Sequence, residues 1–252
     1  MSTEDTVEPA APVDPDRTLH GLADVGRVFF SFPEITDPDR HRDYNLWHQF
    51  DHLPQNRALS GVRHGERWVR SPQCRAASPI APAAAADDRA ADLEAAHYLA
   101  MYWFSDPVDA AIEEWYELAR RTEEVGRRPE LAWTRRPFMG FFEPVAGAAS
   151  DAVRVGAGVV PLLPHAGVVL DVRRGESVDR ADAQRWAGVE GVHGAWTFAG
   201  IGQTAGLVVT LAWCAADPTT LADHVPVAPT GILRTPLAAI VPGEWDWFTA
   251  SR

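Results

Sequence analysis

The sequence predicts an α+β protein in which one β-α-β-β-α-β pattern occurs twice. Short segments rich in Val, Phe and Trp alternate with amphipathic segments that follow an Asp N-cap. Their order in residues 25–150 is repeated in shorter form in residues 151–252. The chain has 252 residues, of which 46% are hydrophobic and 23% charged, so it can bury one large core or two smaller ones.

The first unit contains four predicted strands and two predicted helices. The strands are residues 26–35, 62–69, 97–104 and 137–144. The first helix covers residues 38–59, with Asp37 as its cap and Pro38 in its first turn. The second follows Asp106-Pro107 and extends to about residue 125. This order is that of the split β-α-β, or ferredoxin-like, unit.

The second unit repeats the order with shorter helices. Its predicted strands are residues 167–172, 193–198, 206–214 and 233–241, and its helices are residues 179–186 and a stunted 219–224. Asp217-Pro218 follows the third strand here, as Asp106-Pro107 does in the first unit. Each four-stranded sheet would carry helices on one face only. We therefore expect two sheets packed face to face, with a barrel-like core and the helices outside.

The remaining segments are expected to be a tail and loops. Residues 1–24 are rich in Pro and acidic residues, which predicts a disordered acidic tail, and they lack the features of a secretory signal. Residues 78–91 and 145–158 are rich in Ala with Pro or Gly and are interpreted as loops. No run of about 18 apolar residues occurs, so a cytoplasmic protein without membrane contact is expected.

Charge, cysteine usage and motifs exclude several function classes. With 23 basic and 35 acidic residues the formal net charge is −12, which disfavours binding to nucleic acid. Cys74 and Cys214 are the only cysteines, so neither a disulfide framework nor a cysteine zinc site is indicated. The sequence has no Walker loop, no G-x-G-x-x-G and no G-x-S-x-G.

Residues 44–68, YNLWHQFDHLPQNRALSGVRHGERW, carry a family resemblance. They resemble the dimeric α/β-barrel superfamily, in particular its EthD-like and antibiotic-biosynthesis-monooxygenase-like branches, whose first helix commonly shows N-x-W-x-x-x-x-H-L-P. The matching residues are Asn45, Trp47, His52, Leu53 and Pro54. The resemblance implies a tandem ferredoxin-like repeat in which the second half replaces the partner of a dimer. Members act as cofactor-free monooxygenases, lactone isomerases, polyketide cyclases or haem-binding enzymes, and the fold does not decide among these.

The same segment contains the candidate catalytic residues. His48 and His52 are four residues apart and share a helix face, and Asp51 is three residues after His48. An imidazole titrates near neutral pH and can shuttle a proton. We expect His52 to be the acid/base, with His48 or Asp51 as its orienting or relay group. In the alternative, His52 ties the helix end to a loop and His48 faces solvent.

The expected substrate pocket is lined by large rings and cations of the first unit, because the second unit lacks an H-L-P sequence. An arginine of the second strand could pair with a substrate carboxylate or enolate. The expected substrate-binding residues are Tyr44, Trp47, Phe30, Phe32, Arg67, Trp68, His97 and Tyr102.

A metal or haem is not predicted, and neither is another cofactor. H-x-x-x-H on a helix can give two ligands, but a third from His41, His64, His97 or Glu34 has no diagnostic spacing. Haem is suggested only by analogy with tandem members of the superfamily, whose basic propionate-binding residues have no clear match here.

The predicted function is that of a cofactor-independent enzyme of secondary or catabolic metabolism. It would act by histidine acid/base proton transfer, as a cyclase, isomerase, dehydratase or related lyase, on a small apolar aromatic or polyketide-like molecule. The alternatives are a cofactor-free monooxygenase of an electron-rich phenol and a non-catalytic small-ligand-binding protein. The expected partner is a small-molecule substrate, with no nucleic acid and no membrane. Whether copies of the chain form a homo-oligomer beyond the internal pseudo-dimer is left open.

Overall fold

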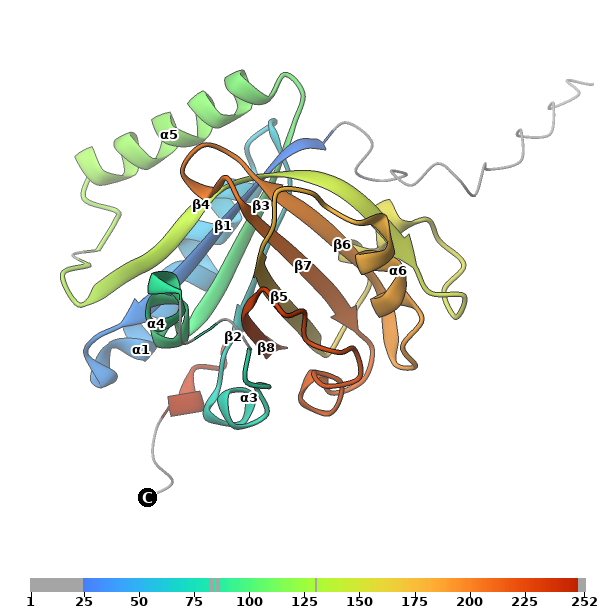
Figure 1. The fold of residues 1–252 in the computed structure, drawn as a ribbon. Helices are drawn as coiled ribbons and strands as arrows, with labels where there is room; N and C mark the ends of the chain where they lie inside the picture. Colours follow the sequence, from blue (N-terminus) through green and yellow to red (C-terminus); the bar gives the residue numbers. More distant parts are fainter. Residues whose placement is uncertain (1–24, 82–83, 85–86, 130, 249–252) are drawn as a thin grey trace, which may run out of the picture.

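The computed structural model describes residues 25–81, 84, 87–129 and 131–248. Eight antiparallel strands form one closed barrel, with the helices on its outside (Figure 1). The strands are β1 (Val25–Ile35), β2 (Val62–Val69), β3 (Tyr98–Ser105), β4 (Thr134–Ala149), β5 (Gly167–Arg174), β6 (Val192–Gly200), β7 (Leu207–Cys214) and β8 (Gly231–Ala239). The predicted α+β class is confirmed. The predicted tail, residues 1–24, lies outside the described residues.

The strand order around the barrel is β1-β3-β2-β8-β5-β7-β6-β4. The strands of the first half are neighbours in the order β4-β1-β3-β2, and those of the second half in the order β8-β5-β7-β6. We expected two separate sheets packed face to face, but their edges join where β2 meets β8 and where β4 meets β6. The β2–β8 joint is short: among the described residues only Trp68 and Val69 pair across it, with Ala239 and Ala238, so the barrel closes there at one end of the two strands. The division of the chain at residue 150 stays a prediction.

The inside of the barrel is a packed apolar core. Its main cluster takes side chains from all eight strands, and Trp68, Trp103, Trp196 and Trp213 are fully buried. The indole Nε1–H of Trp68 donates to Nε2 of His165 at 3.0 Å. The barrel is therefore filled by side chains, and a ligand site has to lie on its outer face.

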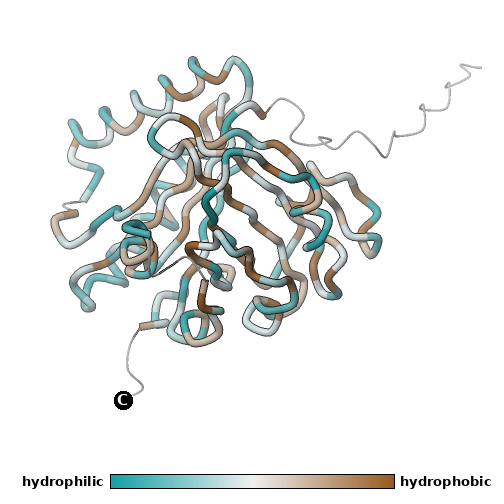
Figure 2. The backbone as a smooth tube through the Cα atoms, in the orientation of Figure 1, coloured by the Kyte–Doolittle hydropathy of each residue, from teal (hydrophilic) through white to brown (hydrophobic). Residues whose placement is uncertain are grey.

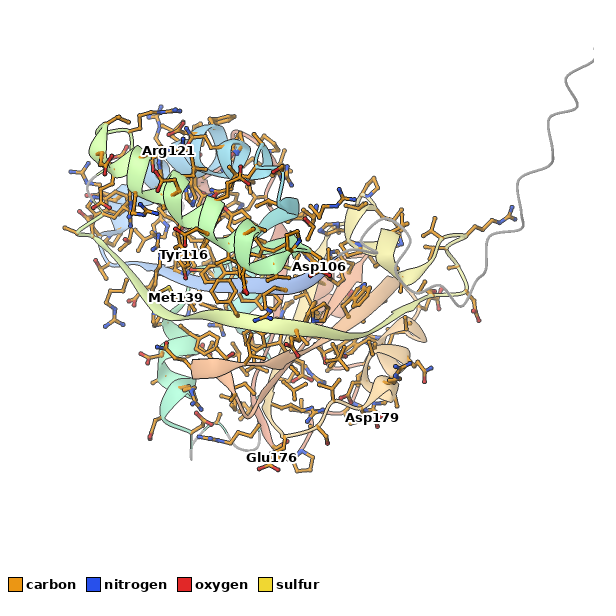
Figure 3. The ribbon with its side chains drawn as sticks, turned by 90° about the horizontal axis from the view of Figure 1, so that it is seen from above. Asp106, Tyr116, Arg121, Met139, Glu176 and Asp179 are labelled. Carbon is orange, nitrogen blue, oxygen red and sulfur yellow. The ribbon has the colours of Figure 1, made fainter. Side chains whose placement is uncertain are left out.

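The helices lie on the outer face of the barrel. They are α1 (His41–Trp47), α2 (Leu53–Arg57), α3 (Pro72–Ala76), α4 (Asp88–Ala95), α5 (Val108–Glu124) and α6 (Arg180–Ala187). Hydrophilic and hydrophobic residues alternate along α5, as expected of an amphipathic helix (Figure 2). Seen from above, α5 lies over the barrel, and its Tyr116 is on the side that faces Met139 of β4 (Figure 3). Among the described residues, no helix is both long and apolar enough to cross a membrane.

Close contact between α5 and the barrel depends on Gly61, the residue directly before β2. A Cβ atom at Gly61 would lie 2.4 Å from the Cβ of Ala111 on α5, so no larger residue fits without a shift. Ala111 belongs to a buried cluster with Phe29, Val62 and Phe104. This cluster fixes α5 above β1, β2 and β3.

The expected loops at residues 78–91 and 145–158 were partly wrong. Residues 145–149 continue β4, because β6 provides a second ladder with Ala146 opposite Thr197. Gly147 leaves room for the ring of Trp196, whose Cε2 atom would be 2.5 Å from an added Cβ. In the other segment α4 begins at Asp88, capped by Asp87, whose side chain accepts from the N–H of Arg89. The expected second helix at residues 219–224 is only a 3-10 turn over Pro218–Thr220.

Candidate active site

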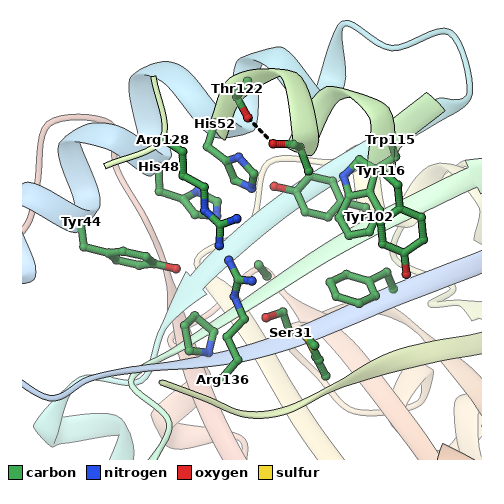
Figure 4. A pocket seen from close by; sticks show the side chains of 15 residues that line it. Ser31, Tyr44, His48, His52, Tyr102, Trp115, Tyr116, Thr122, Arg128 and Arg136 are labelled. Atoms are coloured by element: carbon green, nitrogen blue, oxygen red, sulfur yellow. Dashed lines mark hydrogen bonds between the residues drawn. The ribbon is translucent and has the colours of Figure 1, made fainter. Parts of the chain in front are cut away.

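A cavity of about 270 Å³ lies on the outer face of the barrel, between α5, the helical segment after β1, and strands β1, β3 and β4. Most of the side chains around it are aromatic or apolar. Its lining residues are Phe29, Ser31, Pro33, Tyr44, His48, His52, Ala100, Tyr102, Trp115, Tyr116, Ala119, Thr122, Arg128, Arg136 and Met139. Figure 4 shows these side chains gathered below α5.

The two histidines stand on a π-helical turn, His48–His52, between α1 and α2. The N–H of Leu53 bonds to the carbonyl of His48, one residue further back than in an α-helix. Pro54 has no N–H, so the regular α-helical ladder cannot continue through this point. The side-chain amide of Asn56 donates to the carbonyl of His52 at 2.6 Å. The sequence around Pro54 thus holds the turn that presents both imidazoles to the cavity.

Several polar atoms around the cavity lack a partner. The rings of His48 and His52 are 5.1 Å apart between centroids, and the His52 ring stacks on Trp47 at 4.6 Å. Nδ1 of His48 and the hydroxyl of Tyr102 are buried without a hydrogen bond among the described residues. Buried polar atoms are nearly always paired in folded proteins, so these are positions where a bound molecule would find a hydrogen bond.

Both imidazoles are uncharged at neutral pH. Burial, followed by the charges of Arg136, Arg128 and Arg67, lowers the pKa of His52 to about 3. Burial and then Arg67 hold the pKa of His48 well below its ordinary value. A neutral imidazole can accept a hydrogen bond or a proton, and these lowered pKa values make both imidazoles weak proton acceptors in the ligand-free cavity.

Asp51 does not contact either histidine. Its carboxylate forms an ion pair with Arg127, which is exposed. The expected relay from Asp51 to His48 or His52 is therefore absent among the described residues. Without a carboxylate next to them, the two imidazoles have nothing to stabilise a proton in the ligand-free cavity.

Arg67 is buried next to the cavity but does not line it. Its guanidinium lies over the rings of Tyr44 and Tyr98, at 4.7 and 4.2 Å from their centroids. None of its side-chain nitrogens has a hydrogen-bond partner among the described residues. It lines a second cavity of about 170 Å³, to which His48 also belongs. Arg67 thus adds a positive charge behind His48.

The predicted pocket residues are only partly brought together. Tyr44 and Tyr102 line the cavity, as do His48 and His52, while Trp47 supports the ring of His52. The other predictions were wrong in placement. Phe30, Phe32 and Trp68 belong to the core inside the barrel.

His97 also lies outside the cavity. Its Nδ1 accepts the backbone N–H of Ile35 at 3.1 Å, and its ring packs on His41 and Phe248. His97 is therefore part of the contact between β1, α1 and the C-terminal segment, and has no position from which to bind a ligand of the cavity.

Several cavity residues were not found by sequence reasoning. They are Phe29, Ser31, Trp115, Tyr116, Arg128, Arg136 and Met139. Phe29 and Ser31 alternate with Phe30 and Phe32 along β1, and the alternation itself was the available signal. It did not decide the faces, because both faces of β1 are apolar and both are covered.

The helical segment is held by the C-terminal part of the described chain. Gln49 accepts the N–H of Gly243 at 2.9 Å and donates to the carbonyl of Glu244 at 3.0 Å. Phe248 stacks on His41 at 4.2 Å between centroids. These contacts hold α1 and the π-helical turn against the barrel.

The described residues do not fit a metal site. They contain no group of three or more His, Cys, Asp or Glu side chains that could hold a metal ion. The considered third ligands are occupied elsewhere, since His41 bonds to the hydroxyl of Tyr98 and His64 pairs with Glu66. Two imidazoles on one turn are too few ligands for a protein zinc site.

Comparison with known proteins gives structural similarity only. No family model matches the sequence, and no curated protein matches it. One similar solved structure is that of a putative chlorite dismutase, with a TM-score of 0.49 and 10% sequence identity over 88% of this chain and 96% of that chain. A second is an anthrone oxidase-like protein, with a TM-score of 0.48 and 13% identity over 89% of this chain and 96% of that chain. A third is a putative monooxygenase from Lactobacillus acidophilus, with a TM-score of 0.41 and 10% identity over 84% of this chain and 93% of that chain. The activities in these names belong to those proteins.

Proposed function

We propose that this chain is an enzyme that removes a proton from a small aromatic or polyketide-like molecule bound below α5. The observation that carries the proposal is that two neutral histidines, an unpartnered tyrosine hydroxyl and two arginines line one largely apolar cavity. The apolar walls would hold a ring, and the polar groups are gathered where a charge would develop.

In the proposed step, the imidazole of His52 takes a proton from an acidic C–H or from a phenol O–H of the bound molecule. The electron pair stays on the substrate as an enolate or phenolate. Arg128 and Arg136 stabilise this charge, and the Tyr102 hydroxyl can donate to the new oxyanion. Protonated His52 then returns the proton to another atom, which completes an isomerisation or a cyclisation without net loss of a proton. The step requires no group beyond these side chains.

We also propose that the barrel is a tandem of two ferredoxin-like units. The support is that the order β4-β1-β3-β2 in the first half corresponds to β8-β5-β7-β6 in the second, when β5 to β8 are counted as the second set of four. In this proposal only the first unit carries a site, since α6 of the second unit has eight residues and no histidine.

The proposed base is tested with a ketone that exchanges slowly, β-tetralone, in heavy water. We expect the protein to accelerate exchange of the α-hydrogens, measured by proton NMR, because His52 removes them reversibly. The variants His52→Ala and His52→Gln should reduce the rate by about 100-fold or more. His224→Ala is the matched control, since His224 is at the surface.

The same experiment separates the two alternatives. Oxygen uptake with an electron-rich phenol, abolished in His52→Ala, would identify a monooxygenase that uses the same base to form the phenolate. Ligand binding that is equal in wild type and His52→Ala, with neither exchange nor oxygen uptake, would contradict an enzyme and indicate a binding protein.

A further inference from the structure

The cavity below α5 has a charge pattern that indicates the charge of its ligand. Arg136 begins the cavity wall on β4, and Arg128 follows α5 after the chain turns at Gly126, which has a φ of 68°. Figure 4 shows the two arginines reaching into the cavity from opposite sides, with their guanidinium groups facing each other. Two like charges in this position repel each other unless an anion lies between them.

The two arginines are weakly partnered within the chain. Arg136 has no ion pair or hydrogen bond with another described residue, whereas its neighbour Arg135 is paired with Glu34 at 2.7 Å. Arg128 has Glu123 at 3.6 Å, a carboxylate whose side chain is 71% exposed, and such surface pairs contribute little. The chain thus neutralises Arg135 and leaves Arg136 facing the cavity.

The rest of the cavity adds no negative charge. The protein has 35 acidic residues against 23 basic ones, and yet none of the described residues that line this cavity is Asp or Glu. His48 and His52 are neutral, and buried Arg67 adds a further positive charge behind them. In a protein with a net charge of −12, this cavity is a positively charged exception.

We propose that the ligand of this cavity carries a carboxylate, or an equivalent planar oxyanion, which bridges Arg128 and Arg136. A guanidinium binds a carboxylate through two parallel N–H bonds, and two guanidinium groups can each take one of its edges. In Figure 4 the arginines and the histidines lie at one end of the cavity, and Trp115 and Tyr116 at the other. The ligand would therefore place its anionic group near His52 and its apolar rings toward Trp115.

This inference rests on the proposed function for the choice of cavity and extends it to the charge of the substrate. An anionic ligand would also change the proposed base. Its negative charge would offset the arginine charges that lower the pKa of His52, so the pKa should rise when the ligand binds. The substrate would thus strengthen the base that acts on it.

The test compares β-naphthoate with its methyl ester by isothermal titration calorimetry. We expect the wild-type protein to bind the carboxylate about tenfold or more tightly than the ester, with an affinity that falls as salt is added. Arg136→Gln and Arg128→Gln should each remove most of this preference, because they weaken binding of the carboxylate far more than binding of the ester. Ester binding that persists in both variants shows that the cavity is intact. Arg135→Gln is the matched control and should keep the preference.

A second readout follows the imidazole of His52 by NMR as a function of pH. Addition of β-naphthoate should raise the pKa of His52, whereas the methyl ester should not. Equal binding of the two ligands, or an unchanged preference in Arg136→Gln, would overturn the inference. If naphthoate is preferred but β-tetralone does not exchange, the proposed function fails and the anion site stands. If β-tetralone exchanges and the ligands bind equally, only the anion site fails.

Discussion

Arg67 and Arg70 are both buried and lie three residues apart, but they differ in their hydrogen bonds. Arg70 donates to Thr235 at 2.9 Å and to the carbonyl and the carboxylate of Glu94 at 2.7 and 2.8 Å. Arg67 is 4% exposed and its side-chain nitrogens have no such partner among the described residues. A buried charge without a partner costs free energy of folding, so Arg67 is explained better by the site than by stability.

We therefore predict opposite effects of the same substitution at the two positions. Arg67→Met should raise the free energy of unfolding by about 1–3 kcal/mol, since the cost of the buried charge exceeds the loss of its contacts with two tyrosine rings. It should also slow the exchange of β-tetralone, because a positive charge near the oxyanion is lost. Arg70→Met should lower the free energy of unfolding by about 2 kcal/mol or more.

Urea unfolding measured by circular dichroism gives both values. A loss of stability in Arg67→Met as large as that in Arg70→Met would contradict this interpretation of Arg67.

At the residue scale, the motif and its helix face indicated His52, His48 and Tyr44, and the large rings of the predicted strand at residues 97–104 indicated Tyr102. It could not identify Arg136, because only the folded chain shows that Glu34 pairs with Arg135 and leaves the neighbouring arginine free for the cavity. The placement of Asp51 depended in the same way on Arg127, a residue 76 positions away.

At the scale of elements, Gly65 of β2 leaves room for the ring of Tyr102 on the neighbouring strand β3. A Cβ atom there would lie 2.7 Å from the ring of Tyr102 and 3.4 Å from Cδ1 of Leu53. The side chain of Arg57 also donates to the carbonyl of Gly65 at 2.6 Å. A glycine in a strand interior often marks such a close approach.

Gly65→Ala should therefore lower the free energy of unfolding by about 1–3 kcal/mol and weaken ligand binding, because the Tyr102 ring has to move into the cavity. Gly188→Ala is the control, since an added Cβ there has its nearest neighbours at 3.6 Å. Thermal unfolding and naphthoate titration of the two variants check the prediction. Equal melting temperatures for Gly65→Ala and wild type would contradict it.

The elements themselves were largely predictable from the sequence. The periodicity placed all eight strands to within a few residues, and residues 62–69 were predicted with the same ends as β2. The extension of β4 over residues 145–149 could not be predicted, because Ala and Gly have low strand propensity. These residues are held in a strand by β6, so the decisive partner lies about 50 residues further along the chain.

At the scale of the molecule, four buried or half-buried histidines couple stability to pH. Burial lowers the pKa of His41 and of His97 to about 4 and that of His52 to about 3, and the pKa of His48 lies well below its ordinary value. An unfolded chain binds protons at these residues near pH 6.5. Between about pH 6.5 and pH 4 the unfolded state therefore holds more protons than the folded state, and stability falls as the pH falls.

We predict that the free energy of unfolding is highest above about pH 6.5 and decreases below it by about 1.4 kcal/mol per pH unit for each of these histidines. Urea unfolding at several pH values between about 7 and 5 measures the slope. His97→Gln should reduce the slope by about one proton, and so should His41→Gln. A slope that is the same in His97→Gln and wild type would contradict the assignment.

The hydrogen bonds of Gln49 with Gly243 and Glu244 have a consequence for how the chain folds during its synthesis. Gln49 and Gly243 are separated by 194 positions. The turn that carries both imidazoles therefore leaves the ribosome long before the residues that bond to Gln49 have been synthesised. During translation the first four strands can emerge and pair, but the turn that carries His48 and His52 gains its final support only when β8 and the residues after it have appeared. The candidate site should accordingly reach its final structure among the latest events in the folding of a nascent chain.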